Sequence, residues 1–338
     1  MQVQVTTASC RPRSSARGIG AAAGIVAAVM AVGVPAGNSA SAADPHLGVV
    51  SSGKIIPPAK APPVSPSSPG AAATAAGEVA PADQLAEFKA IAESAEEMNR
   101  LLNLRPMTAA VGAESIVGPD NRVRVTPTTT SPTRATVLII FSAGRCSGWL
   151  IGANTVVTAG HCVHSGRGGA FYPTSSYLIY PGRNGGGSPY GSCGARWLAT
   201  TQAWTNYEDD RYDYAAIKLN CAIGNTVGWY GFFVQNGPLN GLPTNINGYP
   251  GDKALTQWRS SDRVRLTQPQ RVFYQNDTVG GMSGSPVWYN RPGCGPCAMA
   301  VHAYGVYNSP PSPFAANNHG TRITQAAANN LVAWRAAP

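Results

Sequence analysis

The sequence predicts an all-β protein of two packed antiparallel barrels, and three features of residues 115–338 support this prediction. Short runs of β-branched and aromatic residues recur through this region, separated by turns rich in Gly, Pro, Asn and Ser. The region is long enough for two barrels. Only its end, residues 324–335, has the periodicity of a helix, with apolar residues able to pack back on a barrel. The clearest strand candidates are 136–141, 155–157, 177–180 and 215–219.

The first 43 residues predict a signal peptide and therefore secretion. Arginines within 11–17 precede an uncharged, mainly apolar stretch at 18–36, and small residues follow at 40–43. A membrane anchor is the alternative, but the apolar run is near the lower limit for spanning a bilayer. Because a cleavage site follows at once, we expect removal of residues 1–43 and no membrane association.

Residues 44–114 predict a pro-segment that precedes the β-rich domain. Residues 44 to about 80 are rich in Pro, Ala, Ser and Gly and are expected not to pack. A helix is expected at about 83–104, where apolar residues recur at three- and four-residue spacing. Asp83 is its candidate N-cap, and Pro106 ends the run. The helix either docks on the following domain or is a solvated linker, and both alternatives stay open.

Three short motifs in one order predict a catalytic triad. They are TAGHC at 158–162, DYAAI at 213–217 and GMSGSP at 281–286. A serine hydroxyl becomes nucleophilic when an imidazole takes its proton, and a buried carboxylate orients that imidazole. The order His, Asp, Ser is that of chymotrypsin, whereas α/β-hydrolases and subtilisins use other orders. We therefore predict a serine endopeptidase with His161, Asp213 and Ser283 as its triad.

Competing residues surround two members of the triad. Asp209 and Asp210 lie in a polar run, whereas Asp213 leads directly into an apolar strand that would bury its carboxylate. Ser285 competes with Ser283, but the neighbouring glycines favour Ser283. Residues Gly281 and Gly284 permit the tight turn. The backbone N–H groups of Gly281 and Ser283 are the predicted oxyanion hole.

A binding module derived from a protease is the alternative from another functional class. Such a protein would normally have lost one residue of the triad, and all three are present here. The sequence therefore favours an active enzyme.

Six cysteines remain after the predicted loss of Cys10 with the signal peptide, as expected for an oxidising compartment. Cys146 and Cys162 flank the strand that delivers His161, and a disulfide there would clamp the histidine loop. Cys294 and Cys297 are expected to form a local bridge, which leaves Cys193 to pair with Cys221. A zinc site at the Cys-x-x-Cys would need two more soft ligands, and none is evident. We expect no metal and no cofactor.

The net charge changes sign between the pro-segment at 44–114 and the domain at 115–338. Residues 115–338 contain 17 Lys plus Arg and 8 Asp plus Glu, a net of +9, whereas residues 44–114 contain 5 and 8, a net of −3. Opposite charges predict attraction between the pro-segment and the catalytic domain, and a basic surface favours acidic protein substrates. Nucleic acid is the rival partner, but the arginines are dispersed and no nucleic-acid motif is present. We expect no nucleic-acid binding.

Longer segments make the resemblance to a family more specific. The most specific are PGRNG at 181–185 and GYPGDK at 248–253. The others are SIVG at 115–118, CSGWLIG at 146–152, IGNTVG at 223–228, AVH at 300–302 and GTRI at 320–323. With these segments, residues 115–338 resemble the V8-type glutamyl endopeptidases, the bacterial glutamate-specific subfamily of chymotrypsin-like serine proteases.

This resemblance implies a chymotrypsin-like double barrel with the triad in the cleft between barrels. It also implies a pocket for substrate glutamate formed by His302, Thr278 and the α-amino group of Ser115. An imidazole, a hydroxyl and an ammonium together supply the donors and positive charge that a carboxylate requires. The expected enzyme is a monomer that cleaves protein and peptide substrates after glutamate, and more weakly after aspartate.

The position before Ser115 is Glu114, so a glutamate-specific enzyme could release its own mature N-terminus. We therefore expect cleavage between Glu114 and Ser115. The pro-segment that this cut releases is an expected partner of the protease domain.

One residue supports a different specificity. Asp277 lies six residues before Ser283, where trypsin keeps the acid that selects Arg and Lys. Two departures oppose a trypsin: Val279 replaces a half-cystine, and Met282 replaces the aspartate that pairs with the new N-terminus. A trypsin-like or small-residue-specific secreted protease remains the alternative. The other histidines of this region are expected in loops without a role: His46, His164 and His319.

Overall fold

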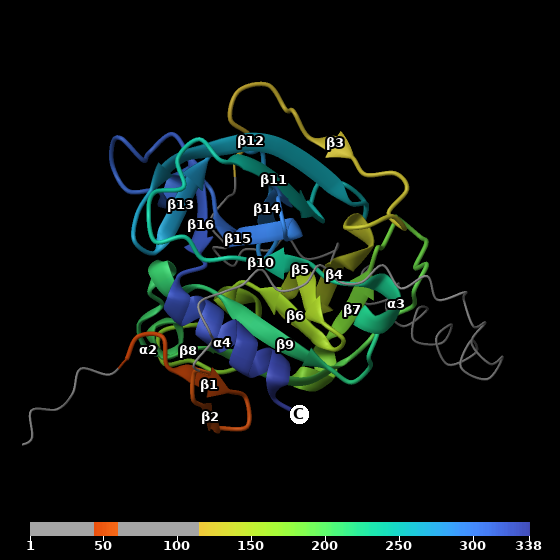
Figure 1. Cartoon of the computed structure of the whole chain (residues 1–338). Coiled ribbons are helices and arrows are strands. Elements are labelled where there is room, and N and C mark those ends of the chain that lie inside the picture. The colour runs from red at the N-terminus through yellow and green to blue at the C-terminus, as the bar shows by residue number, and fades with distance from the viewer. Residues whose placement is uncertain (1–43, 60–114) are drawn as a thin grey trace, which may run out of the picture. The chain divides into compact units, whose positions relative to one another are not determined.

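The β-branched runs of the sequence close into two antiparallel barrels, shown in Figure 1. The computed structural model describes residues 44–59 and 115–338. The predicted signal peptide and the predicted helix at 83–104 lie outside the described residues.

The first barrel has the strand order β8-β9-β6-β5-β4-β7, and an isolated bridge between Ile179 and Cys193 brings its two ends together. All four strand predictions fall in this barrel and are confirmed. Its strands are β4 (Thr136–Phe141), β5 (Gly144–Gly152), β6 (Thr155–Thr158), β7 (Leu178–Pro181), β8 (Ala195–Thr201) and β9 (Ala215–Leu219).

The second barrel has the order β15-β14-β11-β12-β13-β16 and closes through direct pairing of β15 with β16. Two short strands extend it, since β10 pairs with β15 and β3 pairs with β12. The strands are β3 (Val123–Arg124), β10 (Gly231–Phe232), β11 (Pro243–Gly248), β12 (Trp258–Thr267), β13 (Arg271–Tyr274), β14 (Pro286–Arg291), β15 (Gly295–Tyr304) and β16 (Asn318–Arg322).

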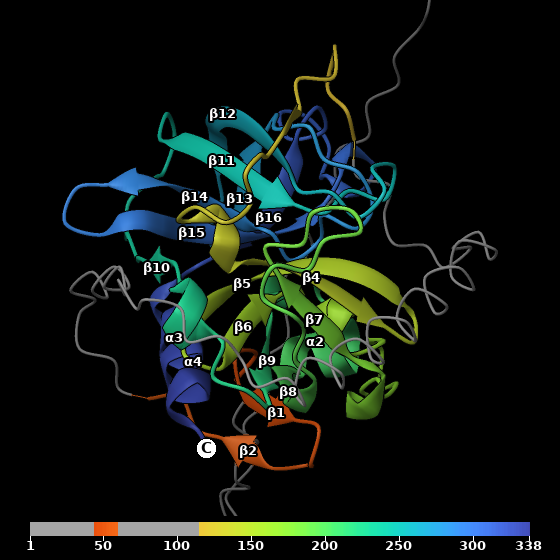
Figure 2. The ribbon, with the colours of Figure 1, turned by 90° about the vertical axis from the view of Figure 1, so that its right-hand side faces the viewer.

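The C-terminal helix confirms the prediction to within one residue at each end. Helix α4 (Gln325–Ala336) begins after Thr324, whose hydroxyl accepts a hydrogen bond from the N–H of Ala327 at 3.3 Å. It lies against β6 and β9 of the first barrel (Figure 2), where Lys218 donates to the carbonyl of Arg335 at 3.0 Å. The other helices are short: α2 (Gln202–Tyr207), α3 (Gly224–Val227) and the 3₁₀ turns Thr133–Ala135, Gly160–Cys162, Thr174–Ser176, Asp210–Tyr212 and Val306–Asn308.

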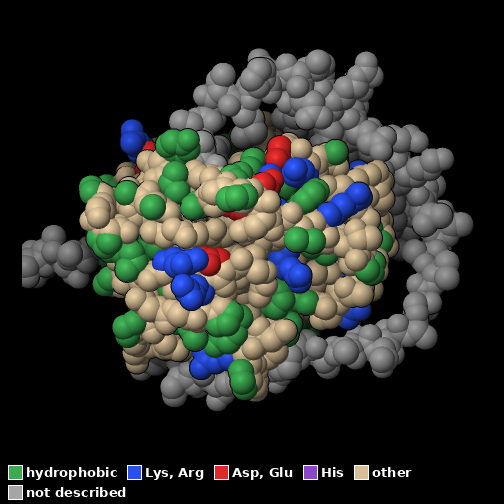
Figure 3. Space-filling model, turned by 90° about the horizontal axis from the view of Figure 1, so that it is seen from above, with side chains coloured by type: hydrophobic (Ala, Val, Ile, Leu, Met, Phe, Trp, Pro, Cys, Tyr) green, Lys and Arg blue, Asp and Glu red, His purple; other side chains and the backbone are tan. Residues whose placement is uncertain are grey.

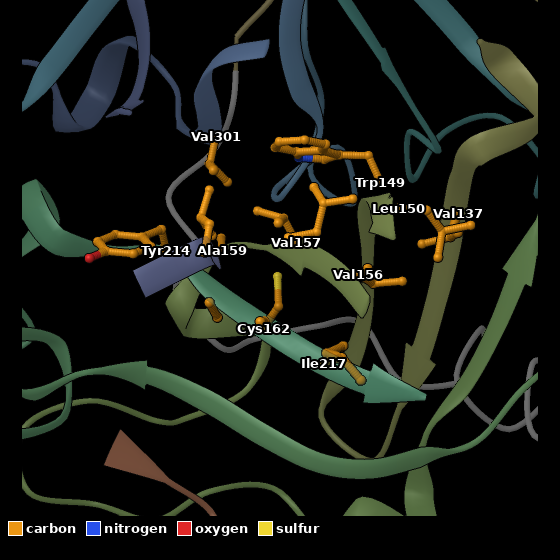
Figure 4. Close-up of a cluster of buried hydrophobic side chains, with 14 of the residues drawn as sticks. Val137, Trp149, Leu150, Val156, Val157, Ala159, Cys162, Tyr214, Ile217 and Val301 are labelled. Carbon is orange, nitrogen blue, oxygen red and sulfur yellow. The ribbon is translucent and has the colours of Figure 1, made fainter. Parts of the chain in front are cut away.

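A shared hydrophobic core joins the two barrels. The largest buried cluster contains first-barrel residues together with Val301 of β15 and other second-barrel residues. Figure 4 shows Val301 above Val157 and Ala159. Ala159 is the N-cap of the 3₁₀ turn Gly160–Cys162, which contains His161. The turn that contains His161 therefore follows a residue packed among apolar side chains, which limits its movement.

The expectation that residues 44 to about 80 do not pack is wrong for residues 44–59. Here β1 (Gly48–Val50) and β2 (Ile55–Ile56) form a hairpin, and β1 pairs antiparallel with β8. The Pro- and Ala-rich composition of the longer stretch conceals a local hairpin signal. Two short β-branched runs flank a turn with Gly53 at a φ of 76°.

All three predicted disulfides are present: Cys146–Cys162, Cys193–Cys221 and Cys294–Cys297. The second bridge ties the segment before β8 to the residues after β9. Within residues 44–59 and 115–338, no helix has the length and apolar character needed to cross a bilayer.

The packing of α4 predicts a large stability effect at Leu331, whose side chain is fully buried. Leu331→Ala should lower the free energy of unfolding by about 2–5 kcal/mol, because it leaves a cavity. The control Gln325→Ala, on the exposed side of the same helix, should change it by less than about 0.5 kcal/mol. Denaturant unfolding measures both variants, and equal midpoints would contradict this account of helix packing.

Candidate active site

His161 and Asp213 are joined by two hydrogen bonds. His161 lies in the 3₁₀ turn after β6, and Asp213 lies just before β9, the neighbour of β6 in the sheet. The Asp213 carboxylate contacts Nδ1 of His161 at 2.7 Å and accepts the His161 backbone N–H at 2.9 Å. Both ring position and ring orientation are therefore set by one carboxylate.

Asp213 is fully buried, and its partners keep it charged. Burial alone raises the pKa of Asp213, but the charge of His161 and hydrogen bonds from His161 and Tyr304 hold it below its ordinary value. Tyr304 belongs to β15, and Thr321 of β16 donates to the Asp213 carbonyl at 3.0 Å. The second barrel thus supplies two groups that hold Asp213.

Sequence reasoning missed Tyr304 and its bond to Asp213. The residue lies two positions after His302, and side chains at this spacing in a strand share a face. This two-residue spacing was the one signal in the sequence that linked Tyr304 to the position of His302. The β15–β16 pairing shifts register between these two residues, and the sequence does not reveal that shift.

Ser283 lies beside the His161 turn on a loop held from both barrels. Its carbonyl accepts the N–H of Ser147 at 2.8 Å, and the Cys162 sulfur lies 3.9 Å from the same oxygen. The next residue, Gly284, donates its N–H to the His302 carbonyl at 2.7 Å. These contacts bring the predicted serine, the histidine turn and the strand of His302 to one place.

The turn around Ser283 requires glycine on both sides, as the sequence predicted. Gly281 has a φ of 102°, and Gly284 has a φ of 88°. A Cβ at Gly281 would lie 2.7 Å from the Tyr249 carbonyl oxygen, and one at Gly284 would lie 2.2 Å from that of Ser147. Larger residues at either position would displace the turn that carries the predicted oxyanion donors.

Among residues 44–59 and 115–338, one group of three possible metal ligands is close enough to share an ion. It consists of Cys146, His161 and Cys162. The two sulfurs are bonded to each other, and His161 is bonded to Asp213, so this cluster is a clamp on the histidine turn.

His302 is fully buried on β15 and its position is set by a tyrosine. The Tyr274 hydroxyl and Nδ1 of His302 are 2.7 Å apart. His302 is paired across the sheet with Gly320, where a Cβ would lie 2.9 Å from that hydroxyl. Gly320 therefore leaves the space in which Tyr274 reaches His302.

The other two predicted pocket residues, Thr278 and Ser115, are hydrogen-bonded to each other. The Thr278 side chain is fully buried, and its Oγ1 has no hydrogen-bond partner among the described residues. The carbonyl of Ser115 accepts the Thr278 N–H at 3.3 Å and the Asn318 side-chain amide at 2.7 Å. Asn318 pairs across the sheet with Tyr274, so the three predicted pocket residues converge on one end of β13, β15 and β16. Asn318 is a second residue that sequence reasoning missed.

Asp277 binds backbone amides. One carboxylate oxygen accepts the N–H of Val117 at 2.7 Å, and the other accepts the N–H of Asn121 at 2.7 Å. The side chain is fully buried. Asp277 therefore anchors residues 115–121, which we call the N-terminal arm, to the second barrel.

A buried arginine fixes the base of the N-terminal arm. The guanidinium of Arg122 pairs with Asp120 at 2.8 Å and with Asp252 at 2.7 Å. Immediately after it, β3 adds to β12. The arm is thus held along its length, with Ser115 at its inner end.

Several surface arginines are paired with carboxylates. On the face in Figure 3 the basic side chains are separated by other groups and do not form a track. Examples of pairs are Arg265 with Asp262, Arg271 with Asp210 and Arg211 with Asp209.

The three histidines expected in loops without a role are buried and bonded. His319 lies in β16 and stacks on Tyr304 at 5.2 Å, and burial lowers its pKa to about 3. Nδ1 of His164 accepts the Gly166 N–H at 2.9 Å. His46 contacts the Tyr214 hydroxyl at 2.9 Å. His46 and His164 lie outside the named strands and helices, as expected, whereas the expectation of a loop is wrong for His319.

Comparisons with known proteins identify the family of the chain. Residues 146–293 match the trypsin-like peptidase domain. A glutamyl endopeptidase of Bacillus licheniformis is 43% identical over 235 residues, which cover 68% of this chain and 72% of that protein. The chain belongs to the glutamyl endopeptidase family. It is a serine protease, as the sequence predicted.

A solved relative extends the family assignment to the fold. The structure of a Glu endopeptidase in complex with MPD superposes with a TM-score of 0.59 at 29% identity, covering 66% of this chain and all of that one. The predicted chymotrypsin-like double barrel is confirmed.

One relative has a name from another mechanistic class. An extracellular metalloprotease of Bacillus subtilis is 40% identical over 229 residues, covering 65% of this chain and 69% of that protein. The H-E-x-x-H zinc motif of many metalloproteases does not occur in the present sequence.

The anchoring of the N-terminal arm predicts the effect of an isosteric change. Asp277→Asn replaces one acceptor oxygen by a donor, so one of the two arm amides loses its partner at a cost of about 1–3 kcal/mol. Hydrogen exchange at the Val117 and Asn121 amides should accelerate about 10- to 100-fold. Asp209→Asn is the control, because Asp209 pairs with Arg211 and not with the arm, and it should leave the exchange of these amides unchanged. Unchanged exchange in Asp277→Asn would contradict the anchoring role.

Proposed function

We propose that the chain is a secreted endopeptidase that cleaves peptide bonds after glutamate, and more weakly after aspartate. The observation that carries this proposal is the convergence of Ser115, Thr278 and His302 beside the Ser283 turn. His302 donates its N–H to the Ser285 carbonyl at 2.9 Å, so the candidate pocket directly adjoins the candidate nucleophile.

The triad supports acyl transfer by the usual steps. Ser283 attacks the scissile carbonyl while His161 accepts its proton and then delivers it to the leaving amine. Asp213 holds the Nδ1 proton of His161 and stabilises the imidazolium that forms. Water then hydrolyses the acyl-enzyme, again with His161 as the base. The N–H groups of Gly281 and Ser283 stabilise the oxyanion in both steps, each donor contributing a rate factor on the order of 10²–10³.

The pocket chemistry favours a carboxylate over an amide. Thr278 offers a buried hydroxyl, His302 offers a ring whose other nitrogen meets Tyr274, and cleavage before Ser115 creates an ammonium. A charged substrate group gains hydrogen bonds and Coulomb attraction from such a set, whereas glutamine gains only the hydrogen bonds.

The contacts of Asp277 do not favour the trypsin-like alternative. It depended on Asp277 as a free carboxylate in the specificity pocket. Both oxygens of Asp277 instead accept backbone N–H groups of the N-terminal arm. The acid that would attract Arg or Lys thus serves to position Ser115.

The distribution of glutamate along the chain fits self-processing. Residues 115–338 contain a single glutamate, Glu208, whereas six glutamates lie between residues 78 and 114. A glutamate-specific protease with this composition can cut its own pro-segment at many points and offers one site in its catalytic domain. Secretion through the signal peptide at 1–43 and maturation after Glu114 complete the proposal.

His302→Ala tests the specificity pocket. Hydrogen bonds to charged groups contribute about 1.5–3 kcal/mol, so the ratio of kcat/KM for Glu over Gln substrates should fall about 10- to 100-fold. Cleavage of the Gln substrate should persist. The control His164→Ala changes another buried histidine and should keep the original ratio. An unchanged ratio in His302→Ala would remove His302 from the pocket.

Ser283→Ala tests the triad and self-processing together. The variant should lose activity by a factor on the order of 10⁶. Its secreted form should keep the bond between Glu114 and Ser115 intact, whereas the wild-type protease domain should begin at Ser115. N-terminal sequencing and intact mass measure both. Normal maturation of the variant would show that another protease makes the cut, and a wild-type start at Ile116 would refute the site.

A further inference from the structure

The hairpin at residues 44–59 extends the sheet of the first barrel. Strand β1 pairs with β8 in the register Gly48–Thr201, Val49–Thr200 and Val50–Ala199. Beyond the strand, the carbonyls of Leu47 and Pro45 accept the first two N–H groups of α2, at 2.8 and 3.2 Å. An added strand of this kind satisfies the edge of a sheet by main-chain hydrogen bonds.

Side chains make the docking specific. His46 is buried between Tyr212 and Tyr214, with ring centroids 4.8 and 6.1 Å away. Its carbonyl accepts a hydrogen bond from the side-chain amide of Asn330, on α4. That amide also donates to the Tyr214 hydroxyl at 2.8 Å, so one contact joins the hairpin, α4 and the residue next to Asp213.

Close packing against Trp334 requires a glycine at position 48. A Cβ there would lie 2.9 Å from Nε1 of Trp334. Val50, two residues on, is buried in the main core of the first barrel. The hairpin is therefore built into the barrel, although it precedes the proposed cleavage point.

The hairpin also lacks glutamate, the residue after which the proposed enzyme preferentially cuts. Residues 44–59 contain no glutamate, and the first glutamate of the chain is Glu78. Self-cleavage at glutamates would therefore shorten the pro-segment from Glu114 back to Glu78 and leave the docked hairpin whole.

We propose that residues 44–59 remain bound to the protease domain after the cut at Glu114, so that the mature enzyme consists of two non-covalent pieces. This inference rests on the proposed maturation. The smaller piece begins near Asp44 and ends at Glu78 or at a later glutamate. Its docking keeps the β8 edge paired.

Secreted enzyme tests the proposal directly. The protein is purified by size-exclusion chromatography at neutral pH. The polypeptides that elute together in its peak are then identified by mass spectrometry under denaturing conditions. We expect the domain that begins at Ser115 together with a peptide that contains residues 44–59. A domain mass alone would overturn the inference while leaving the maturation intact. One uncut chain would instead overturn the proposed maturation.

A pair of variants tests the docking mode. Gly48→Val should clash with Trp334, so the small peptide should be lost from the peak. Ile55→Val, at an exposed position on β2, should retain it. Loss of the peptide in Gly48→Val with normal catalytic activity in the remaining piece would support docking at β8. Equal retention in both variants would overturn it.

Discussion

The Asp213 carboxylate has no contact with solvent, so the protein must supply every group that stabilises its charge. The first barrel supplies the ring and the backbone N–H of His161, and the second supplies the hydroxyl of Tyr304. An uncompensated charge in this position would cost several kcal/mol. The two barrels are therefore coupled through one buried ion, and the proposed catalytic geometry is a consequence of satisfying it.

A second buried carboxylate organises the proposed specificity. Both carboxylate oxygens of Asp277 accept N–H groups of the N-terminal arm. At the inner end of the arm, the Ser115 carbonyl accepts hydrogen bonds from Thr278 and Asn318. A cut before Ser115 changes a neutral peptide nitrogen into an ammonium without requiring the arm to move. On this account, maturation adds charge to a pocket that is already assembled.

The sequence could predict whatever depended on local pattern. Four strand runs of the first barrel and the helix α4 carry local signals, and they lie where expected. The glycines around Ser283 also carry a local signal, and both have the positive φ of a tight turn. Asp277 was ambiguous because its partners, Val117 and Asn121, lie 160 and 156 residues away in the chain. The hairpin at 44–59 was missed because short strands depend on the β8 edge, which composition does not describe.

The proposed ammonium at Ser115 gives the most direct test. Periodate converts an N-terminal serine into an aldehyde and removes its amino group, and mass spectrometry confirms the conversion. The account predicts that treated enzyme loses most of its preference for Glu over Gln substrates while it still cleaves Gln. Ser115→Val, whose N-terminus periodate does not oxidise, should keep its preference through the same treatment. An unchanged preference in fully converted enzyme would contradict the claim that the new N-terminus reads the substrate carboxylate.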